Sequence, residues 1–267
     1  MLLAVAGLAR STFFYHQARL QRPDPKAELN AEIRTVFEQA KGRYGHRRIH
    51  RELHKRGHQI AKKTVLKQMR TIGLVCLVRR RTRFTTDRSA IGTTSPNRLN
   101  RVFTAPAPNL SWVTDVTEFR IGEERLYLSP VMDLFDRQII AYSLDRASNL
   151  ALTTTALRQA IATLPPDHHP LVHSDQGFQY QHRSWQAILA EAGATPSMSR
   201  KGTCLDNAMI ENFFGHVKSE LFLDQFTTID ALTLAIHDYL HWYNHDRTSA
   251  TLNGLSPVDY RSQALIV

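Results

Sequence analysis

The chain has 267 residues, of which 42% are hydrophobic, so it can hold one sizeable domain or a small domain joined to a medium one. No apolar run approaches the roughly 18 residues of a membrane-spanning helix, so a helical membrane protein is excluded. The two cysteines, Cys76 and Cys204, form neither a disulfide framework nor a zinc-binding Cys-x-x-Cys pair, which favours a reducing, cytoplasmic environment.

The net charge of +10 is concentrated in one part of the chain. Between Lys41 and Arg83 there are 15 Lys and Arg residues against one acid, Glu52, so this block carries +14 and the rest sums to −4. A basic block followed by a mildly acidic domain is typical of a DNA-binding arm attached to a carboxylate catalytic site. A solvated basic face is the simpler alternative, but this density of cations favours contact with nucleic acid.

The first third of the chain has helical periodicity. Residues 1–25 are predicted to form short helices, and apolar positions recur at helical spacing in 26–41, 46–56 and 61–72. Three short helices with basic outer faces predict a helix-turn-helix region at 26–80. We expect DNA contacts from its outward cations, which are Arg43, Arg47, Arg48, Arg51, Lys62, Lys63, Lys67 and Arg70. Residues 81–108 are basic, then polar and proline-containing, and are predicted to be a linker.

Four histidines recur at every fourth position in this region: His46, His50, His54 and His58. His50 and His54 lie one helical turn apart and could share a metal. Because no pair of cysteines accompanies them, phosphate contact or plain exposure is the favoured interpretation.

From residue 109 the pattern changes to strands. Strands are predicted at 112–119, 125–135 and 139–144, then a helix at 150–163, a strand at 170–175, a helix at 183–192, a strand at 194–199 and helices around residue 211 and at 228–243. This order predicts a mixed α/β sheet flanked by helices, and residues 109–267 are assigned to one catalytic domain with a C-terminal helical extension.

Three carboxylates in this domain have contexts that suit metal ligands. Asp115 lies in a buried strand, Asp175 ends a strand before the turn Gln176-Gly177, and Glu211 lies on a helix with Asp206 as its expected N-cap. Thirty-five residues separate Asp175 from Glu211. Three acids from separate elements can converge on a pair of Mg²⁺ or Mn²⁺ ions, which is the requirement of phosphoryl transfer at a DNA phosphodiester.

The residues around these acids resemble a known family. The matching stretches are Trp112-Val-Thr-Asp115-Val-Thr, His173-Ser-Asp175-Gln-Gly-Phe-Gln-Tyr180, the segment Ser199–Lys218, Tyr243-Asn244, Leu255–Arg261 and Arg43–His50. They resemble the second-frame (OrfB-type) transposases of bacterial insertion sequences, the IS-three family, which is related to retroviral integrases. The C-terminal segment departs from the family pattern, because few basic residues follow Tyr243-Asn244.

The resemblance implies a ribonuclease-H-like core, preceded by a helix-turn-helix region, that cuts transposon ends and joins them to target DNA. It also implies double-stranded DNA as partner, a homo-oligomer on DNA, a nucleoid-associated cytoplasmic location and an upstream-frame (OrfA-type) protein or fusion. Two alternatives stay open. One is a ribonuclease-H-type nuclease, and the other is a catalytically inactive DNA-binding remnant or repressor.

Several further residues have assigned roles. Lys218 lies two helical turns after Glu211, so we expect it to contact a DNA phosphate, as the family implies. Asn244 and Arg247 are weaker candidates for DNA contact. The rival acids are Asp133, an alternative ligand, Asp136, which fits a hairpin turn, and Glu118, which strand alternation sends to the face opposite Asp115. The expected core residues are Trp112, Phe213 and Phe214.

Overall fold

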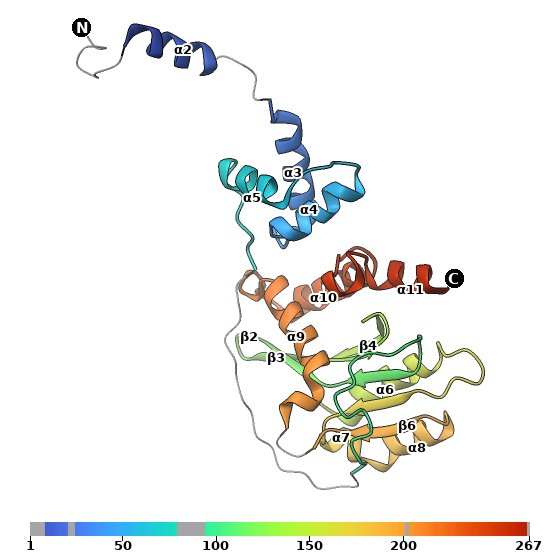
Figure 1. Ribbon diagram of the computed structural model, residues 1–267. Helices are drawn as coiled ribbons and strands as arrows, with labels where there is room; N and C mark the ends of the chain where they lie inside the picture. The colour runs from blue at the N-terminus through green and yellow to red at the C-terminus, as the bar shows by residue number, and fades with distance from the viewer. Residues whose placement is uncertain (1–8, 21–24, 79–93, 201–202, 266–267) are drawn as a thin grey trace. The chain divides into compact units, whose positions relative to one another are not determined.

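The structure is a computed structural model that describes residues 9–20, 25–78, 94–200 and 203–265, and the chain divides into two compact units, Met1–Val78 and Arg79–Val267 (Figure 1). Within these described ranges, no helix combines the length and apolar character needed to cross a bilayer.

The first unit is built from helices. Its helices are α2 (Arg10–Leu20), α3 (Ala27–Gln39), α4 (His46–Lys55) and α5 (Lys62–Thr71), which confirms the three helices expected between residues 26 and 72. Apolar residues of α3, α4 and α5 form its core, namely Ile33, Val36, Ile49, Leu53, Val65 and Met69. Gly57 ends α4 in a left-handed conformation (φ +88°), and the N–H of His58 returns to the carbonyl of Leu53.

The second unit contains a six-stranded mixed sheet. Its strands are β1 (Ser111–Thr114), β2 (Thr117–Ile121), β3 (Glu124–Asp133), β4 (Ile139–Asp145), β5 (Leu171–Ser174) and β6 (Thr195–Met198). The order is β2-β3-β1-β5-β6, with β4 also paired to β3. β5 is parallel to both β1 and β6, whereas β3 is antiparallel to its neighbours.

The strand predicted at 112–119 is interrupted. β1 and β2 pair with the same edge of β3 in one continuous register, from Trp112↔Asp133 to Ile121↔Glu124, but Asp115 and Val116 between them belong to neither strand. The Asp115 carboxylate accepts a hydrogen bond from the N–H of Val116 (2.7 Å). This local bond accompanies the break in the strand, so Asp115 lies at a strand end.

Helices cover both faces of the sheet. One face packs against α9 (Ala208–Glu220) and α10 (Ile229–His245), and the other against α6 (Leu150–Ile161) and α8 (Arg183–Glu191). Adjacent residues of β1 alternate between the two cores: Trp112 belongs to one and Val113 to the other. Trp112, Phe213 and Phe214 are buried, as expected. The remaining elements are α7 (Phe178–Gln181), α11 (Pro257–Leu265) and the 3₁₀ turns η1 (Cys204–Asn207), η2 (Leu223–Gln225) and η3 (Ala250–Leu252).

The segment expected to be a linker, 81–108, differs from that expectation in its described half. Leu99 is buried in the core that includes α9 and α10, and Phe103 and Ala105 pack against it. The Ser197 hydroxyl accepts hydrogen bonds from the N–H groups of Arg98 (2.9 Å) and Leu99 (3.1 Å). Residues 95–105 are therefore part of the second unit. The prolines and polar residues of this segment suggested a linker, because its apolar side chains are few and have no regular spacing.

Candidate active site

Asp115 and Asp175 follow the ends of two adjacent parallel strands. β1 and β5 pair as Ser111↔Leu171, Trp112↔Val172 and Val113↔His173, and the same register continued by two residues sets Asp115 opposite Asp175. The Asp175 carboxylate accepts a hydrogen bond from the N–H of Gly177 (2.8 Å). A Cβ at position 177 would lie 2.9 Å from that carboxylate oxygen, so glycine permits this tight turn.

Glu211, on helix α9, lies close enough to Asp115 for the two charges to interact. Ile210, Phe213, Phe214 and Val217 bury one side of the helix, while Glu211 in its first turn is exposed. Burial raises the pKa of Asp115 well above its ordinary value, and the charges of Asp175 and Glu211 raise it further. The structure therefore brings the three predicted acids close enough for mutual electrostatic repulsion.

The three carboxylates are chemically suitable ligands for a divalent cation, although their oxygens are not arranged around one point. In the part of the chain that the structure describes, no group of three or more His, Cys, Asp or Glu side chains is close enough to hold a metal ion. Asp115 and Asp175 each direct one oxygen to a nearby backbone N–H. Hard carboxylate oxygens that repel one another are a donor set that Mg²⁺ or Mn²⁺ would stabilise, so the residues fit this cofactor.

Two further polar groups adjoin these acids, and neither was predicted from the sequence. The buried Asn207 amide lies close enough to Asp115 to lower its pKa. The buried Tyr180 hydroxyl lies near Asp115 and Asp175, whose charges add to the effect of burial in raising its pKa. Both residues lie in stretches that carry the family resemblance, which was the only available signal for them.

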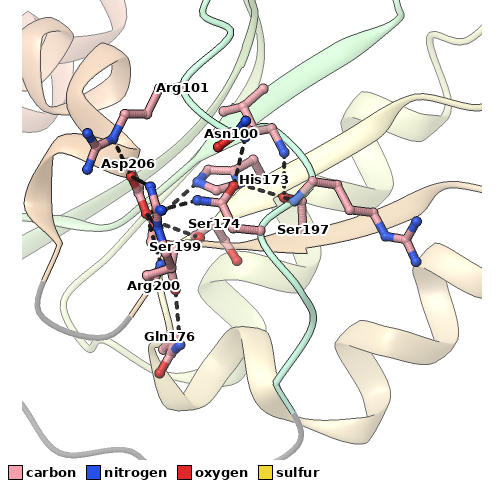
Figure 2. A network of polar contacts seen from close by, with 12 residues as sticks. Asn100, Arg101, His173, Ser174, Gln176, Ser197, Ser199, Arg200 and Asp206 are labelled. Carbon is pink, nitrogen blue, oxygen red and sulfur yellow. Dashed lines mark hydrogen bonds and ion pairs between the residues drawn. The ribbon is translucent and has the colours of Figure 1, made fainter.

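Asp206 has a different role from the one expected. The N-cap of α9 is Asn207, and Asp206 is instead buried with 0% exposure. Its carboxylate accepts hydrogen bonds from Arg200 Nε (2.9 Å) and Nη2 (2.9 Å), Arg101 Nε (2.7 Å) and Asn97 Nδ2 (2.8 Å). The hydrogen bonds from Arg200, with that from Arg101, hold the pKa of Asp206 well below its usual range. Figure 2 shows the side chains of Arg101 and Arg200 meeting at Asp206 from segments far apart in sequence.

A second set of bonds in Figure 2 joins the ends of β5 and β6. The buried His173 ring contacts Ser197 Oγ through Nδ1 (2.8 Å) and Ser199 Oγ through Nε2 (3.1 Å). Burial lowers the pKa of His173 to about 4, so the ring is neutral at neutral pH. Gln176 Nε2 donates to the Ser199 carbonyl (3.0 Å). The loop that carries Asp175 is thereby fixed to the segment that leads toward Glu211.

The rival acids are engaged elsewhere. Asp133 accepts hydrogen bonds from the N–H of Asn109 (2.7 Å) and from Arg261 Nη2 (2.7 Å), and Asp136 pairs with Arg261 Nε. Asp133 therefore serves the fold and is wrong as an alternative ligand. Glu118 accepts from the Tyr127 hydroxyl (2.9 Å) on the neighbouring strand.

The predicted DNA-contacting cations are mostly accessible. Arg47, Lys62, Lys63, Lys67 and Arg70 are exposed, and Arg48 and Arg51 are partly exposed. Arg43 is only 8% exposed, so its assignment to an outward basic face is corrected. The Arg48 guanidinium lies over the Tyr44 ring (5.4 Å), and Lys218 Nζ lies over the Phe119 ring (5.5 Å).

His50 and His54 share a backbone partner. Both Nε2 atoms contact the carbonyl of Ile60, at 2.9 Å and 3.2 Å. Each ring N–H donates to this oxygen, which fixes the chain that follows α4. The spacing of His50 and His54 thus has a structural explanation.

Asn244 and Arg247 also serve the fold, which corrects their suggested DNA contact. Asn244 forms two hydrogen bonds with the backbone of Ile139, at 3.0 Å and 2.9 Å. Arg247 is 4% exposed and forms a bidentate pair with the buried Glu220 (2.9 Å for each bond).

Comparison with known proteins identifies both units. An integrase core domain matches residues 105–204, a second integrase core family matches 211–265, and an HTH-like domain matches 24–82. The putative transposase InsK for insertion sequence element IS150 of Escherichia coli is 46% identical over 98% of this chain and 93% of its own length. The transposase InsF for insertion sequence IS3A of the same species is 30% identical over 99% of this chain and 93% of its own length.

Among solved structures, the simian T-cell lymphotropic virus intasome in complex with PP2A regulatory subunit B56 gamma has a similar fold. The TM-score is 0.50 at 15% identity, covering 79% of this chain and 73% of that chain, which supports the expected integrase-type, ribonuclease-H-like fold. Since relatives match nearly its whole length, the chain belongs to the insertion-sequence transposases with an integrase core, the IS-three type that its acidic motifs resemble.

Proposed function

We propose that this chain cuts DNA at the ends of its insertion sequence and joins those ends to target DNA, with Asp115, Asp175 and Glu211 as its catalytic, metal-holding residues. The observation that carries the proposal is that Asp115 and Asp175 follow the ends of the paired strands β1 and β5, with Glu211 in the first turn of α9 close enough for its charge to raise the pKa of Asp115. Membership of the transposase family supports the reaction class.

The reaction consists of two displacements at phosphorus. Water attacks the phosphodiester at the transposon end, which frees a 3′-hydroxyl, and this hydroxyl attacks a phosphodiester of the target. One P–O bond forms and one breaks in each step, so neither a covalent link to the protein nor an outside energy source is required. Two Mg²⁺ or Mn²⁺ ions held by the acids would activate the attacking oxygen and stabilise the leaving oxygen.

The other residues bind and position the DNA. The exposed cations of α4 and α5 bind duplex phosphates, and Lys218 on α9 binds a phosphate beside the acids. The Asp206 and His173 networks hold the loops that carry Asp175 and Glu211. We further propose a homo-oligomer on DNA, aided by an upstream-frame protein or fusion that improves selectivity for the transposon ends.

An end-labelled strand-transfer assay tests the proposal. Asp115→Asn, Asp175→Asn and Glu211→Gln should each abolish cleavage and joining while gel shifts show nearly unchanged DNA binding. Glu118→Gln is the matched control, because this acid binds Tyr127 and should be dispensable. Substantial activity in any of the three variants removes that residue from the site. Wild-type cleavage confined to RNA–DNA hybrids would favour a nuclease, and DNA binding without any cleavage would favour an inactive remnant.

A further inference from the structure

Asn207 combines burial with unsatisfied polar atoms. Asn207 is 4% exposed, and neither its Nδ2 nor its Oδ1 has a hydrogen-bond partner in the described structure. Buried amides are normally paired, because leaving a donor or acceptor without a partner costs the desolvation of that group. A buried amide without partners indicates that a bound ligand supplies the missing contacts.

The side chain also forgoes the bond that its position favours. Asn207 is the N-cap of α9, where an asparagine oxygen usually accepts a first-turn N–H. Asn149 does this for α6 by accepting from Leu152 N (2.8 Å), and Thr228 does it for α10 by accepting from Ala231 N (3.2 Å). Asn207 makes no such bond. Its amide is therefore directed elsewhere.

The direction of that amide is toward Asp115. The Asn207 side chain lies close enough to this carboxylate to lower its pKa. A carboxylate can only accept a hydrogen bond, so Nδ2 is the atom that interacts favourably with it, and the buried Oδ1 has no hydrogen-bond partner in the described structure. The preceding residue, Asp206, is clamped by Arg200 and Arg101 (Figure 2), so the backbone that carries Asn207 is held in place.

We propose that Asn207 is a fourth residue of the divalent-metal centre: Nδ2 orients the Asp115 carboxylate, and Oδ1 supplies a neutral oxygen to the bound ion. This inference rests on the proposed function above. Amide oxygens suit Mg²⁺ and Mn²⁺. A neutral ligand also completes the oxygen set without adding a fourth negative charge to three that already repel.

Metal binding by the full chain without DNA tests this inference. Free Mn²⁺ is measured by electron paramagnetic resonance, and melting temperatures are measured with Mn²⁺ and with EDTA. Asn207→Ala should weaken Mn²⁺ binding roughly tenfold or more. It should lose no helix cap, because Asn207 makes no first-turn bond, so its melting temperature in EDTA serves to show that the variant is folded. Asn149→Ala is the matched control: it should melt lower in EDTA, since a true cap is lost, and bind Mn²⁺ normally.

Asn207→Asp distinguishes the role of the amide donor, Nδ2, from the role of the amide oxygen, Oδ1. It keeps an oxygen and replaces the donor by a fourth charge, so it should melt lower than wild type in EDTA and bind Mn²⁺ at least as tightly. Normal Mn²⁺ affinity in Asn207→Ala would overturn the inference. Should that variant fail to fold, weaker Mn²⁺ binding by Asn207→Asp would overturn it instead. Asp115→Asn distinguishes this inference from the proposed function. If both Asp115→Asn and Asn207→Ala bind Mn²⁺ like wild type, the proposed metal site itself is wrong. If Asp115→Asn binds Mn²⁺ more weakly and Asn207→Ala binds it normally, only the role of Asn207 is wrong.

Discussion

Asp115 and Asp175 each lie two residues beyond Val113 and His173, the last paired positions of the parallel strands β1 and β5, and the charge of Asp175 raises the pKa of Asp115. The sheet register therefore holds two carboxylates together before any cation is present. Burial and this neighbouring charge raise the pKa of Asp115. The arrangement costs stability in the metal-free protein, and a divalent ion would offset that cost.

Relieving this repulsion should stabilise the metal-free protein. Asp115→Asn removes one of the opposed charges, so it should melt above wild type in EDTA. Added Mg²⁺ should raise the melting temperature of wild type: about 10 mM ion and an assumed dissociation constant of about 1 mM give about 1.4 kcal/mol, or roughly 3–6 °C. The Mg²⁺ shift should shrink in Asp115→Asn and Asp175→Asn. Equal shifts in all three proteins would place the ion elsewhere.

The sequence predicted the local setting of each acid. A β-branched run around Asp115 and an apolar run before Asp175 predicted two strands, and helical spacing placed Glu211 on a helix. The expectation that the three acids meet came from their separation and from the family resemblance, whereas the parallel pairing of β1 with β5 was not predicted. The three helices of the first unit followed from the same periodicity.

Polar groups whose partners lie far along the chain could not be predicted. Asp206 looked like a helix cap, yet its partner Arg101 is 105 residues away. Arg247 looked like an exposed cation, yet it pairs with Glu220 at the end of α9. Arg43 fitted a basic pattern but is buried. A charge can be buried wherever the tertiary structure supplies its partner, and the periodicity of the sequence does not indicate which residue that partner is.

DNA binding should depend steeply on salt through the exposed cations of α4 and α5. If five of them meet phosphates, the slope of log affinity against log salt should be roughly −4 to −5. Replacing Lys63 or Arg70 by Ala should reduce the slope by about 1 in each case. Arg34→Ala is the matched control, because Arg34 is exposed on α3 outside the predicted set. A wild-type slope shallower than about −2 would show that most of these charges stay solvated.

Asp206→Asn should loosen the segment between β6 and α9. The variant weakens the ion pairs with Arg200 and Arg101, which are about half exposed, so we expect a loss of roughly 1–2 kcal/mol. Because the pKa of Asp206 is lowered in the folded state, its contribution is present above the ordinary carboxyl value and is lost as pH falls below about 4. The difference in unfolding free energy between the two proteins should therefore shrink between about pH 5 and pH 3. A difference that is constant over this range would contradict the role of the charge.

Arg247 should prove essential for stability and dispensable for DNA contact. Its guanidinium is buried against Glu220, which also accepts a hydrogen bond from the Tyr239 hydroxyl (2.9 Å). Arg247→Met leaves the Glu220 charge buried without its cation, and such changes cost about 3–5 kcal/mol. The double variant Glu220→Gln, Arg247→Met removes both charges and should recover much of that loss. Urea unfolding measures both stabilities, and gel shifts at a temperature where the variants are folded measure DNA affinity, which should match wild type. A single variant of normal stability but weakened DNA binding would restore Arg247 to the DNA interface.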